Sequence, residues 1–564
     1  MKKVYILVAV LIMSACTAEP SMEATVESTT VPPTEQSATE ASQLSDQPSS
    51  PMPNERGELF AASGVCAACH TKMTDEAGND VSNDVFWRSS MMANASRDPY
   101  WRASVMGEVL SNPEYQAVIE DKCATCHTPM ARYTAFVAGD AGKLFQDGFF
   151  HQDNEIHTLA LDGVSCTLCH QIQEEGFGEQ EGYSGGFVID KQAPTGERIA
   201  FGPYAVDEAL AVVMQGASGF APVESPHVEE SELCATCHTL YTPYLDAKGE
   251  IAGEFPEQMP YLEWLHSDYP EAKSCQGCHM PQAQGGVVLS ITGGEPRSPF
   301  YQHEFVGGNV YMLDILRTYG EEMNVIASEA EFAAKAMSVS DQLQNRTVSI
   351  TADASLSDSE LLVNVAVESH VGHKFPSGFP ARRTWLNVTI ADAEGQVLFE
   401  SGAVNPDGSI IGNDNDSDPK SYEPHYQSID SPDQVQIYEA IMQDTEGSLT
   451  TTLLRGAAYV KDNRLLPTGF DKLKAPSDIA VSGLAFEDQD FLGGEDTIQY
   501  EVDIGDAEGP FTVTVNMFYQ SISSRWAENL RQYDALEISD FIGYYESIPN
   551  LPVLAASQVV EVSQ

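Results

Sequence analysis

Five short segments of the sequence place two cysteines three positions apart and a histidine directly after the second cysteine. They read CAACH, CATCH, CTLCH, CATCH and CQGCH, and they begin at Cys66, Cys123, Cys166, Cys234 and Cys275. Two thiols at this spacing on one helical turn can reach the two vinyl groups of one porphyrin, and the histidine then lies beneath the iron. The spacing therefore predicts covalent attachment of haem c at five sites.

Within each predicted site the cysteines and the histidine have different roles. The thioether links are assigned to Cys66, Cys69, Cys123, Cys126, Cys166, Cys169, Cys234, Cys237, Cys275 and Cys278. The proximal iron ligands are His70, His127, His170, His238 and His279. Chance would supply on the order of 0.005 such matches in a chain of this length. Zinc sites and disulfides, the competing interpretations, do not require a histidine after every second cysteine. The expected cofactors are five covalently attached haem c groups.

The residue on the other side of each iron decides whether a haem only transfers electrons or also binds a small molecule. Five of the 13 histidines belong to the motifs, which leaves eight for five irons. The expected distal ligands lie near a motif or on a turn-rich loop, and they are His227, His303, His373 and either His157 or His151. His266 and His425 are left unassigned, because a lone histidine is ordinarily a surface or core residue.

The first haem site has no obvious histidine partner close in the sequence. Residues 86–101, FWRSSMMANASRDPYW, offer Met92 as a distal ligand, with Met91 beside it. A thioether ligand would raise the reduction potential of that haem relative to haems with two histidines. Alternatively, these methionines pack within a helix. Met130 is expected to pack, because it follows His127 too closely to cross to the opposite face of the same haem.

The start of the chain predicts export. Lys2 and Lys3 precede an apolar run from Val4 to Met13, and the run ends in Met-Ser-Ala-Cys at Cys16. This ending resembles the lipobox of bacterial lipoproteins, in which the cysteine is acylated; alternatively, residues 1–16 contain an ordinary cleaved signal. Cys16 is the one cysteine of 11 outside the pairs. Residues 17–57, rich in Ser, Thr, Pro and Glu, are expected to form a disordered tether. The expected location is the cell envelope, with a lipid anchor in the outer membrane.

The charge balance limits the possible partners. The chain has 29 Lys and Arg against 84 Asp and Glu, a formal net charge of −55 at pH 7. Nucleic acid is not expected to bind, because another polyanion would be repelled. The acidic residues are spread along the whole chain, as in a solvated surface suited to salty surroundings. Alternatively, they form a docking face for basic redox proteins. The expected partners are other redox proteins of the cell envelope.

The composition divides the exported part into two domains. Residues 58–343 hold all five motifs and are expected to form a haem-packed, mainly helix-and-loop domain, with a helical pattern over residues 311–344. Residues 344–564 contain segments that alternate apolar and polar residues, among them TVSITADA, LLVNVAVES, TWLNVTI, TIQYEVDI and PFTVTVNMFY. These predict a mainly-β domain, an immunoglobulin-like sandwich with a long insertion from about residue 405 to 490. Residues 392–395 predict a hairpin turn.

The chain resembles the multihaem cytochromes c of the cytochrome c-552/c-554 type. The resemblance lies in the five motifs, in the contexts GVSCTLCHQI and YLEWLHSDYPEAKSCQGCHMP, and in GHKFPSGFPARRTWLNV, QVQIYEAIMQDTEG and YVKDNRLLPTGF. It implies electron transfer, haems with two histidine or histidine and methionine ligands, and an envelope location. It does not imply a substrate, and the β domain lies outside the pattern of the small cytochrome c-554.

Three hypotheses about function follow from these observations. The first is an electron-transfer protein that connects envelope redox partners. The second is a multihaem oxidoreductase that acts on a small nitrogen or sulfur compound at an open haem; no motif, however, has the lysine that replaces histidine at the catalytic haem of some nitrite reductases. In the third, the β domain docks the cytochrome onto a partner.

Overall fold

Each of the five motifs begins in a helix. The computed structural model describes residues 50–563, and the helices concerned are α2 (Ser63–Ala67), α5 (Gln116–His127), α8 (Cys166–Cys169), α10 (Ser231–His238) and α12 (Cys275–His279). The predicted leader, Cys16 and most of the predicted tether lie outside the described residues. The end of the tether belongs to the folded part, because Gly64 N donates to Pro53 O (2.8 Å).

Other short helices and long loops surround the motif helices, as expected for this part of the chain. They are α3 (Asn83–Arg88), α4 (Pro99–Ser111), α6 (Pro129–Ala138), α7 (His157–Leu161), α9 (Glu208–Ser218) and α11 (Pro260–Leu265). Asp98 caps the start of helix α4, because its carboxylate accepts a hydrogen bond from Trp101 N (3.1 Å). Pro99 takes the first position of the helix. Helix α6 ends at Gly139, which has a φ of +92°.

Two small sheets lie between the motifs. Strands β1 (Arg198–Gly202) and β2 (Phe220–Glu224) pair in parallel, and β3 (Leu240–Leu245) and β4 (Ile251–Gln258) form an antiparallel hairpin. The predicted helical stretch after the last motif is present as two helices, α13 (Val310–Thr318) and α14 (Glu329–Arg346). A capping box starts α14, since Ser328 Oγ accepts from Glu331 N (3.3 Å) and Glu331 Oε2 accepts from Ser328 N (2.9 Å).

Two larger sheets follow residue 347. The first has the order β5 (Val348–Ser357), β6 (Glu360–Ser369), β13 (Glu495–Asp503) and β9 (Ser428–Ile429). The second has the order β11 (Leu449–Thr450), β10 (Ile437–Gln443), β7 (Arg383–Ala391), β14 (Phe511–Gln520) and β15 (Val553–Val562), with β12 (Ala458–Asp462) on β10 and β8 (Val397–Ser401) on β7. The predicted turn is confirmed, because Asp392 N bonds to Gln396 O (3.0 Å) between β7 and β8.

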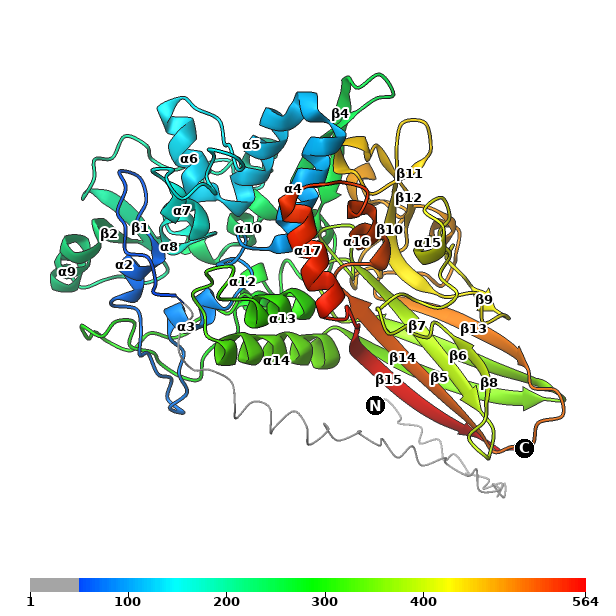
Figure 1. The fold of residues 1–564 in the computed structure, drawn as a ribbon. Helices are drawn as coiled ribbons and strands as arrows, with labels where there is room; N and C mark the ends of the chain where they lie inside the picture. The colour runs from blue at the N-terminus through cyan, green and yellow to red at the C-terminus, as the bar shows by residue number, and fades with distance from the viewer. Residues whose placement is uncertain (1–49, 564) are drawn as a thin grey trace, which may run out of the picture. The chain divides into compact units, whose positions relative to one another are not determined.

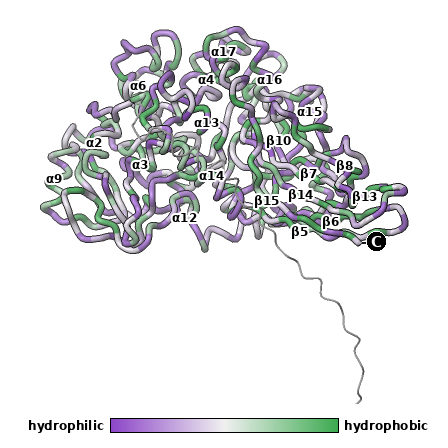
Figure 2. Tube along the Cα trace, turned by 60° about the horizontal axis from the view of Figure 1, so that its bottom comes forward, coloured by the Kyte–Doolittle hydropathy of each residue, from purple (hydrophilic) through white to green (hydrophobic). Residues whose placement is uncertain are grey.

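The two sheets share one core. Val363 and Val365 of β6 belong to the same buried apolar cluster as Val388 of β7 and Val515 of β14. Figure 2 shows hydrophobic stretches recurring along the strands of this region. The chain therefore combines helices with a β domain, as predicted. The same cluster includes Tyr100 of α4 and residues of α13, so the core continues across residue 344.

Three helices of the β region were not predicted: α15 (Asp414–Ser417), α16 (Ser524–Leu530) and α17 (Leu536–Ser547). Helix α17 packs against α4, about 430 residues earlier in the chain, and Figure 1 shows the two side by side. Phe541 of α17 and Tyr100 of α4 have their ring centres 5.2 Å apart. Across residues 50–563, the structure contains no helix with the length and apolar character needed to span a bilayer.

Candidate haem-binding cavity

One continuous cavity connects the five motifs. Its volume is about 1450 Å³, and its lining includes His70, His127, His170, His238 and His279 together with motif cysteines from all five sites. A pocket for one small-molecule ligand is typically about 300–1,000 Å³. The cavity thus has the extent and the attachment residues that several porphyrins require.

Backbone carbonyls orient four of the five motif histidines. The Nδ1 atoms of these imidazoles contact the carbonyl oxygens of Leu289 (2.7 Å from His70), Ala95 (3.0 Å from His127), Phe201 (2.6 Å from His170) and Val306 (2.6 Å from His279). A carbonyl oxygen only accepts, so each Nδ1 must carry the proton, and Nε2 keeps its lone pair for a metal. No sequence signal points to these four carbonyls, which lie 27 to 219 residues along the chain from the histidines that they contact. Across residues 50–563, no comparable hydrogen bond is present at His238.

Burial keeps several imidazoles of the cavity neutral. It lowers the pKa of His127 and of His279 to about 4, and that of His303 to about 3. Neutral imidazole is the form that binds a metal ion. At neutral pH the cavity therefore presents unprotonated ligand atoms.

Two motif histidines each face a second histidine. The ring centres of His170 and His303 are 6.1 Å apart with 23° between the ring planes, and those of His279 and His373 are also 6.1 Å apart, with 10°. Two imidazoles on opposite sides of one metal ion should be about 6 Å apart, since each bond is about 2 Å and each nitrogen lies about 1 Å from its ring centre. No other pair of histidine rings in residues 50–563 comes this close.

The remaining predicted distal histidines lie differently. Both ring nitrogens of His227 are engaged: Nε2 lies 2.8 Å from Ile172 O, to which it donates, and Nδ1 lies 2.6 Å from Ser225 Oγ. That arrangement leaves no nitrogen of His227 for iron. His157 and His151 do not line the cavity. Within residues 50–563, none of these three rings forms a pair with a motif histidine like those of His303 and His373, and their ligand roles stay predictions.

The two methionines of the 86–101 segment line the cavity. Met91 and Met92 lie between α3 and α4, in turns rather than in the helix of the alternative interpretation. Met92 O accepts a hydrogen bond from Val164 N (3.0 Å), two residues before the third motif, and the role of Met92 as a ligand stays a prediction. Met130 is fully buried in an apolar cluster, as expected for a packing residue.

Thiol contacts show which motifs are neighbours. A hydrogen bond with Cys166 lowers the pKa of the Cys66 thiol, and this contact joins the first and third motifs, whose helices α2 and α8 also pack together. A hydrogen bond with Cys234 lowers the pKa of the Cys275 thiol to about 7, and it joins the fourth and fifth motifs. Cys275 N also donates to Ser231 Oγ at the start of α10 (3.1 Å).

The fourth motif has two further neighbours. A hydrogen bond with Cys126 lowers the pKa of the Cys237 thiol, which joins the second and fourth motifs. Leu168 of α8 packs in one apolar cluster with Leu233 and Cys237 of α10, so the third motif also adjoins the fourth. The spatial order is therefore first, third, fourth, with the second and fifth motifs both beside the fourth. Sequence order alone does not give this branched arrangement.

No family model matches the chain, and no curated protein matches it. Among solved structures, the chain is similar to a penta-heme cytochrome c552 from Thermochromatium tepidum. The identity is 16%, the alignment covers 90% of this chain and 100% of that chain, and the TM-score is 0.49.

Cationic side chains line a cavity in an otherwise acidic protein. They are Lys122, Lys273, Lys335, Arg346 and Arg382. Five acidic residues line the same cavity: Asp84, Asp98, Glu108, Glu229 and Glu257. Haem carries two propionate groups, and carboxylates buried in a cavity need cationic or hydrogen-bonding partners. These cations are possible partners for propionates, although the lining as a whole holds as many acidic as basic side chains.

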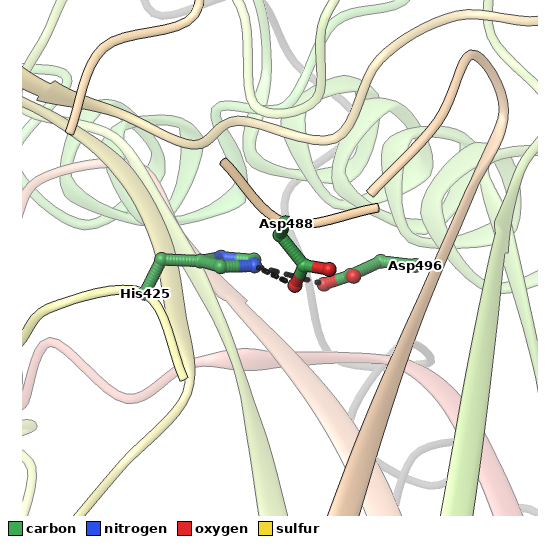
Figure 3. Close-up of side chains that lie close together, drawn as sticks. All are labelled: His425, Asp488 and Asp496. Carbon is green, nitrogen blue, oxygen red and sulfur yellow. Dashed lines mark hydrogen bonds and ion pairs between the residues drawn. The ribbon is translucent and has the colours of Figure 1, made fainter. Parts of the chain in front are cut away.

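One other cluster of possible metal ligands is present in the described chain. His425, Asp488 and Asp496 are buried in the β domain with their ligand atoms within 4.8 Å of one another, and His425 Nε2 lies 3.0 Å from Asp488 Oδ2 (Figure 3). Backbone N–H groups fix the side-chain amides of Gln436 and Asn463, because each amide oxygen accepts one of them (2.9 and 3.0 Å).

The orientation of these amides decides the tautomer of His425. Their NH2 groups point at Nδ1 of His425 from 2.9 and 3.1 Å, so Nδ1 is an acceptor and the proton lies on Nε2. Nε2 then donates to Asp488 and has no lone pair for a metal. We therefore interpret this cluster as a buried hydrogen-bond network.

Proposed function

We propose that the chain is a pentahaem c-type cytochrome that transfers electrons between redox partners. One observation carries this proposal: the five CxxCH motifs line a single cavity, and four of their histidines are held in the tautomer that can bind iron. When bound, each haem supplies a one-electron Fe(III)/Fe(II) couple. The chain's own residues attach the haems, supply their axial ligands and fix their spacing.

The contacts between motifs support a branched order of haem sites. The first site leads through the third to the fourth, which adjoins both the second and the fifth. Three sites, the first, second and fifth, are then ends of the network. This arrangement suits a protein that exchanges electrons with more than one partner.

The location and partners belong to the same proposal. The leader and Cys16 support export and a lipid anchor in the outer membrane, and haem c attachment in bacteria takes place after export. The strongly acidic chain supports contact with other envelope redox proteins and gives no support for nucleic acid. Residues 344–564 supply His373 to the cavity, so the β domain takes part in haem binding in this proposal.

Stopped-flow spectroscopy of the haem-loaded protein tests the electron-transfer function. We expect all five haems to be reduced by a small-molecule reductant and reoxidised by a one-electron acceptor protein on a millisecond timescale. Haems that neither reagent can reach on that timescale would contradict a conducting network.

A second candidate function is catalysis at an open haem, on a small nitrogen or sulfur compound. The observation that favours it is that, within residues 50–563, His70, His127 and His238 face no second histidine ring, so three irons depend on another ligand. Electron paramagnetic resonance separates the two candidates: a high-spin ferric signal supports a ligand-accessible iron. Low-spin signals alone would leave the catalytic function without a site.

A further inference from the structure

The loop that carries His373 contributes one member to a group of four buried charged residues. Glu263, Lys374, Asp462 and Arg464, here called the charged quartet, have at most 7% of their surface exposed. They come from different parts of the chain: Glu263 from α11 ahead of the fifth motif, Lys374 from the 370–379 loop, and Asp462 and Arg464 from the end of β12 and just beyond it. The quartet contains two negative and two positive groups.

Short contacts connect all four members. Lys374 Nζ lies 2.7 Å from Asp462 Oδ2, and Arg464 binds the same carboxylate in a bidentate manner, with both N–O distances at 2.8 Å. Arg464 Nη2 also lies 3.0 Å from Glu263 Oε1. Bidentate pairing of a guanidinium fixes orientation as well as distance.

The second oxygen of Glu263 holds the loop directly. Glu263 Oε2 accepts hydrogen bonds from Lys374 N (3.1 Å) and from Ser377 Oγ (2.7 Å). Phe375 of the loop pairs with Leu465, the residue after Arg464, through two backbone hydrogen bonds (2.8 and 2.9 Å). His373 therefore lies directly beside a residue that is bonded at both its backbone and its side chain.

Stability alone is a poor explanation for the quartet. Removing four charges from water carries a large desolvation cost, and replacing a buried ion-pair network by apolar residues is often neutral or stabilising. What the quartet does supply is geometry. It joins α11, which leads to the motif with His279, to the loop that presents His373 from the β domain.

We propose that the charged quartet positions His373, holding its loop so that the imidazole lies opposite His279 at the fifth haem site. This inference rests on the proposed function, because it needs a haem at that site. Glu263, Lys374, Asp462 and Arg464 are positioning residues in this arrangement: they act on the iron ligand through the loop and do not contact the iron. His303, the distal partner of His170, lies on a different loop and does not depend on them.

Two reference variants identify the relevant signals in the haem-loaded protein. His303→Met and His373→Met each remove one bis-histidine pair, so each should abolish a different low-spin signal in the electron paramagnetic resonance spectrum. The signal lost in His373→Met belongs to the fifth haem.

The test variant is Asp462→Asn, which removes one charge from the quartet with little change in size. We expect loss or displacement of the fifth-haem signal and a shifted reduction potential for that haem, while the His170/His303 signal and the content of five haems are unchanged. Asp416→Asn is the matched control, because it breaks another ion pair of the β domain, Arg383–Asp416 (2.7 Å), whose side chains are 1% and 4% exposed. The control should lower stability and keep both signals.

Ser377→Ala provides a milder test if Asp462→Asn does not accumulate as folded protein. It removes only the hydroxyl donor to Glu263, and we expect a smaller displacement of the same signal. Unchanged fifth-haem signals in both variants, with five haems bound, would overturn the positioning role and leave the electron-transfer function intact. A His373→Met spectrum identical to that of the wild type would instead contradict the His279/His373 pair, and a wild-type protein without haem would contradict the proposed function.

Discussion

At the level of single residues, the predicted distal histidines differ in the partners of their ring nitrogens. His303 and His373 each face a motif histidine at 6.1 Å between ring centres, whereas both nitrogens of His227 are bonded to protein atoms. The sequence places His227 and His303 similarly near a motif. Their difference depends on contacts with Ile172 and Ser225 that no motif encodes.

Replacement of His303 and of His227 should therefore have different effects. His303→Met substitutes a thioether on one haem, so the potential of that haem should rise and its bis-histidine low-spin signal should disappear. His227→Gln should leave every signal in place if the two hydrogen bonds of this side chain persist when haem is bound. A potentiometric titration followed by electron paramagnetic resonance measures both. A loss of signal in His227→Gln would show that the hydrogen-bonded tautomer is not the one present with haem.

The buried carboxyl of Asp496 should make the stability of the protein depend on pH. Burial raises the pKa of this carboxyl from its usual 3.8 to about 7. The folded protein thus holds the proton more tightly than the unfolded chain, and the free energy of unfolding falls as the pH rises from about 4 to about 7.

Asp496→Asn should remove that part of the pH dependence. At pH 8 we expect the variant to be more stable than the wild type by up to about 4 kcal/mol, with the difference vanishing below about pH 4. Denaturant unfolding at several pH values measures this. A variant that loses stability equally at pH 5 and pH 8 would contradict a protonated Asp496 and would indicate that the carboxylate itself is needed.

At the level of helices and strands, Gly185 lies where the second and fourth motifs come close together. Gly185 has a φ of +80°, its N–H donates to Thr236 O (2.6 Å), and a Cβ there would lie 2.2 Å from Thr125 Cγ2. Thr125 and Thr236 lie inside the second and fourth motifs. A side chain at position 185 would therefore push the two motif helices apart.

Gly185→Ala should cost about 2–4 kcal/mol of stability, from the left-handed backbone and from the clash together. Gly139→Ala is the control, because Gly139 has a similar φ of +92° but a Cβ added there would meet no atom within 4 Å. That control should cost only about 1 kcal/mol. Chemical denaturation of the haem-loaded variants compares the two, and equal losses would contradict close contact between the second and fourth motifs.

Much of the element structure could be predicted from the sequence. The strands β5, β6, β7, β13 and β14 follow segments with clear alternation, and α13 and α14 follow the helical pattern of residues 311–344. Helices α16 and α17 were missed because their buried faces are defined by α4 and other distant partners. The five attachment sites follow from local spacing, whereas the carbonyls that orient them and the charged quartet depend on tertiary contacts.

For the whole molecule, the β domain and the motif domain depend on each other. His373 reaches the cavity from beyond residue 344, and Glu108 of α4 accepts hydrogen bonds from Leu453 N (2.5 Å) and Leu454 N (3.3 Å). One apolar cluster includes residues from both parts. A cut at the predicted boundary would expose much of this cluster to water.

A chain truncated after residue 343 should therefore not fold as an independent cytochrome. We expect strongly reduced yield, and in any recovered protein the absence of the His279/His373 low-spin signal. Expression with haem-staining gels and spectroscopy would measure this. A soluble fragment with five haems and an unchanged spectrum would contradict the dependence of the motif domain on the β domain.

The proposed function depends on five covalently bound haems per chain. Haem quantitation combined with the intact mass of the denatured protein, after expression in a host with export and cytochrome maturation, measures them directly. We predict a coloured protein whose mass exceeds that of the mature polypeptide and its lipid by five haem groups. A colourless protein with ten free thiols at the motif cysteines would contradict haem attachment and electron transfer alike.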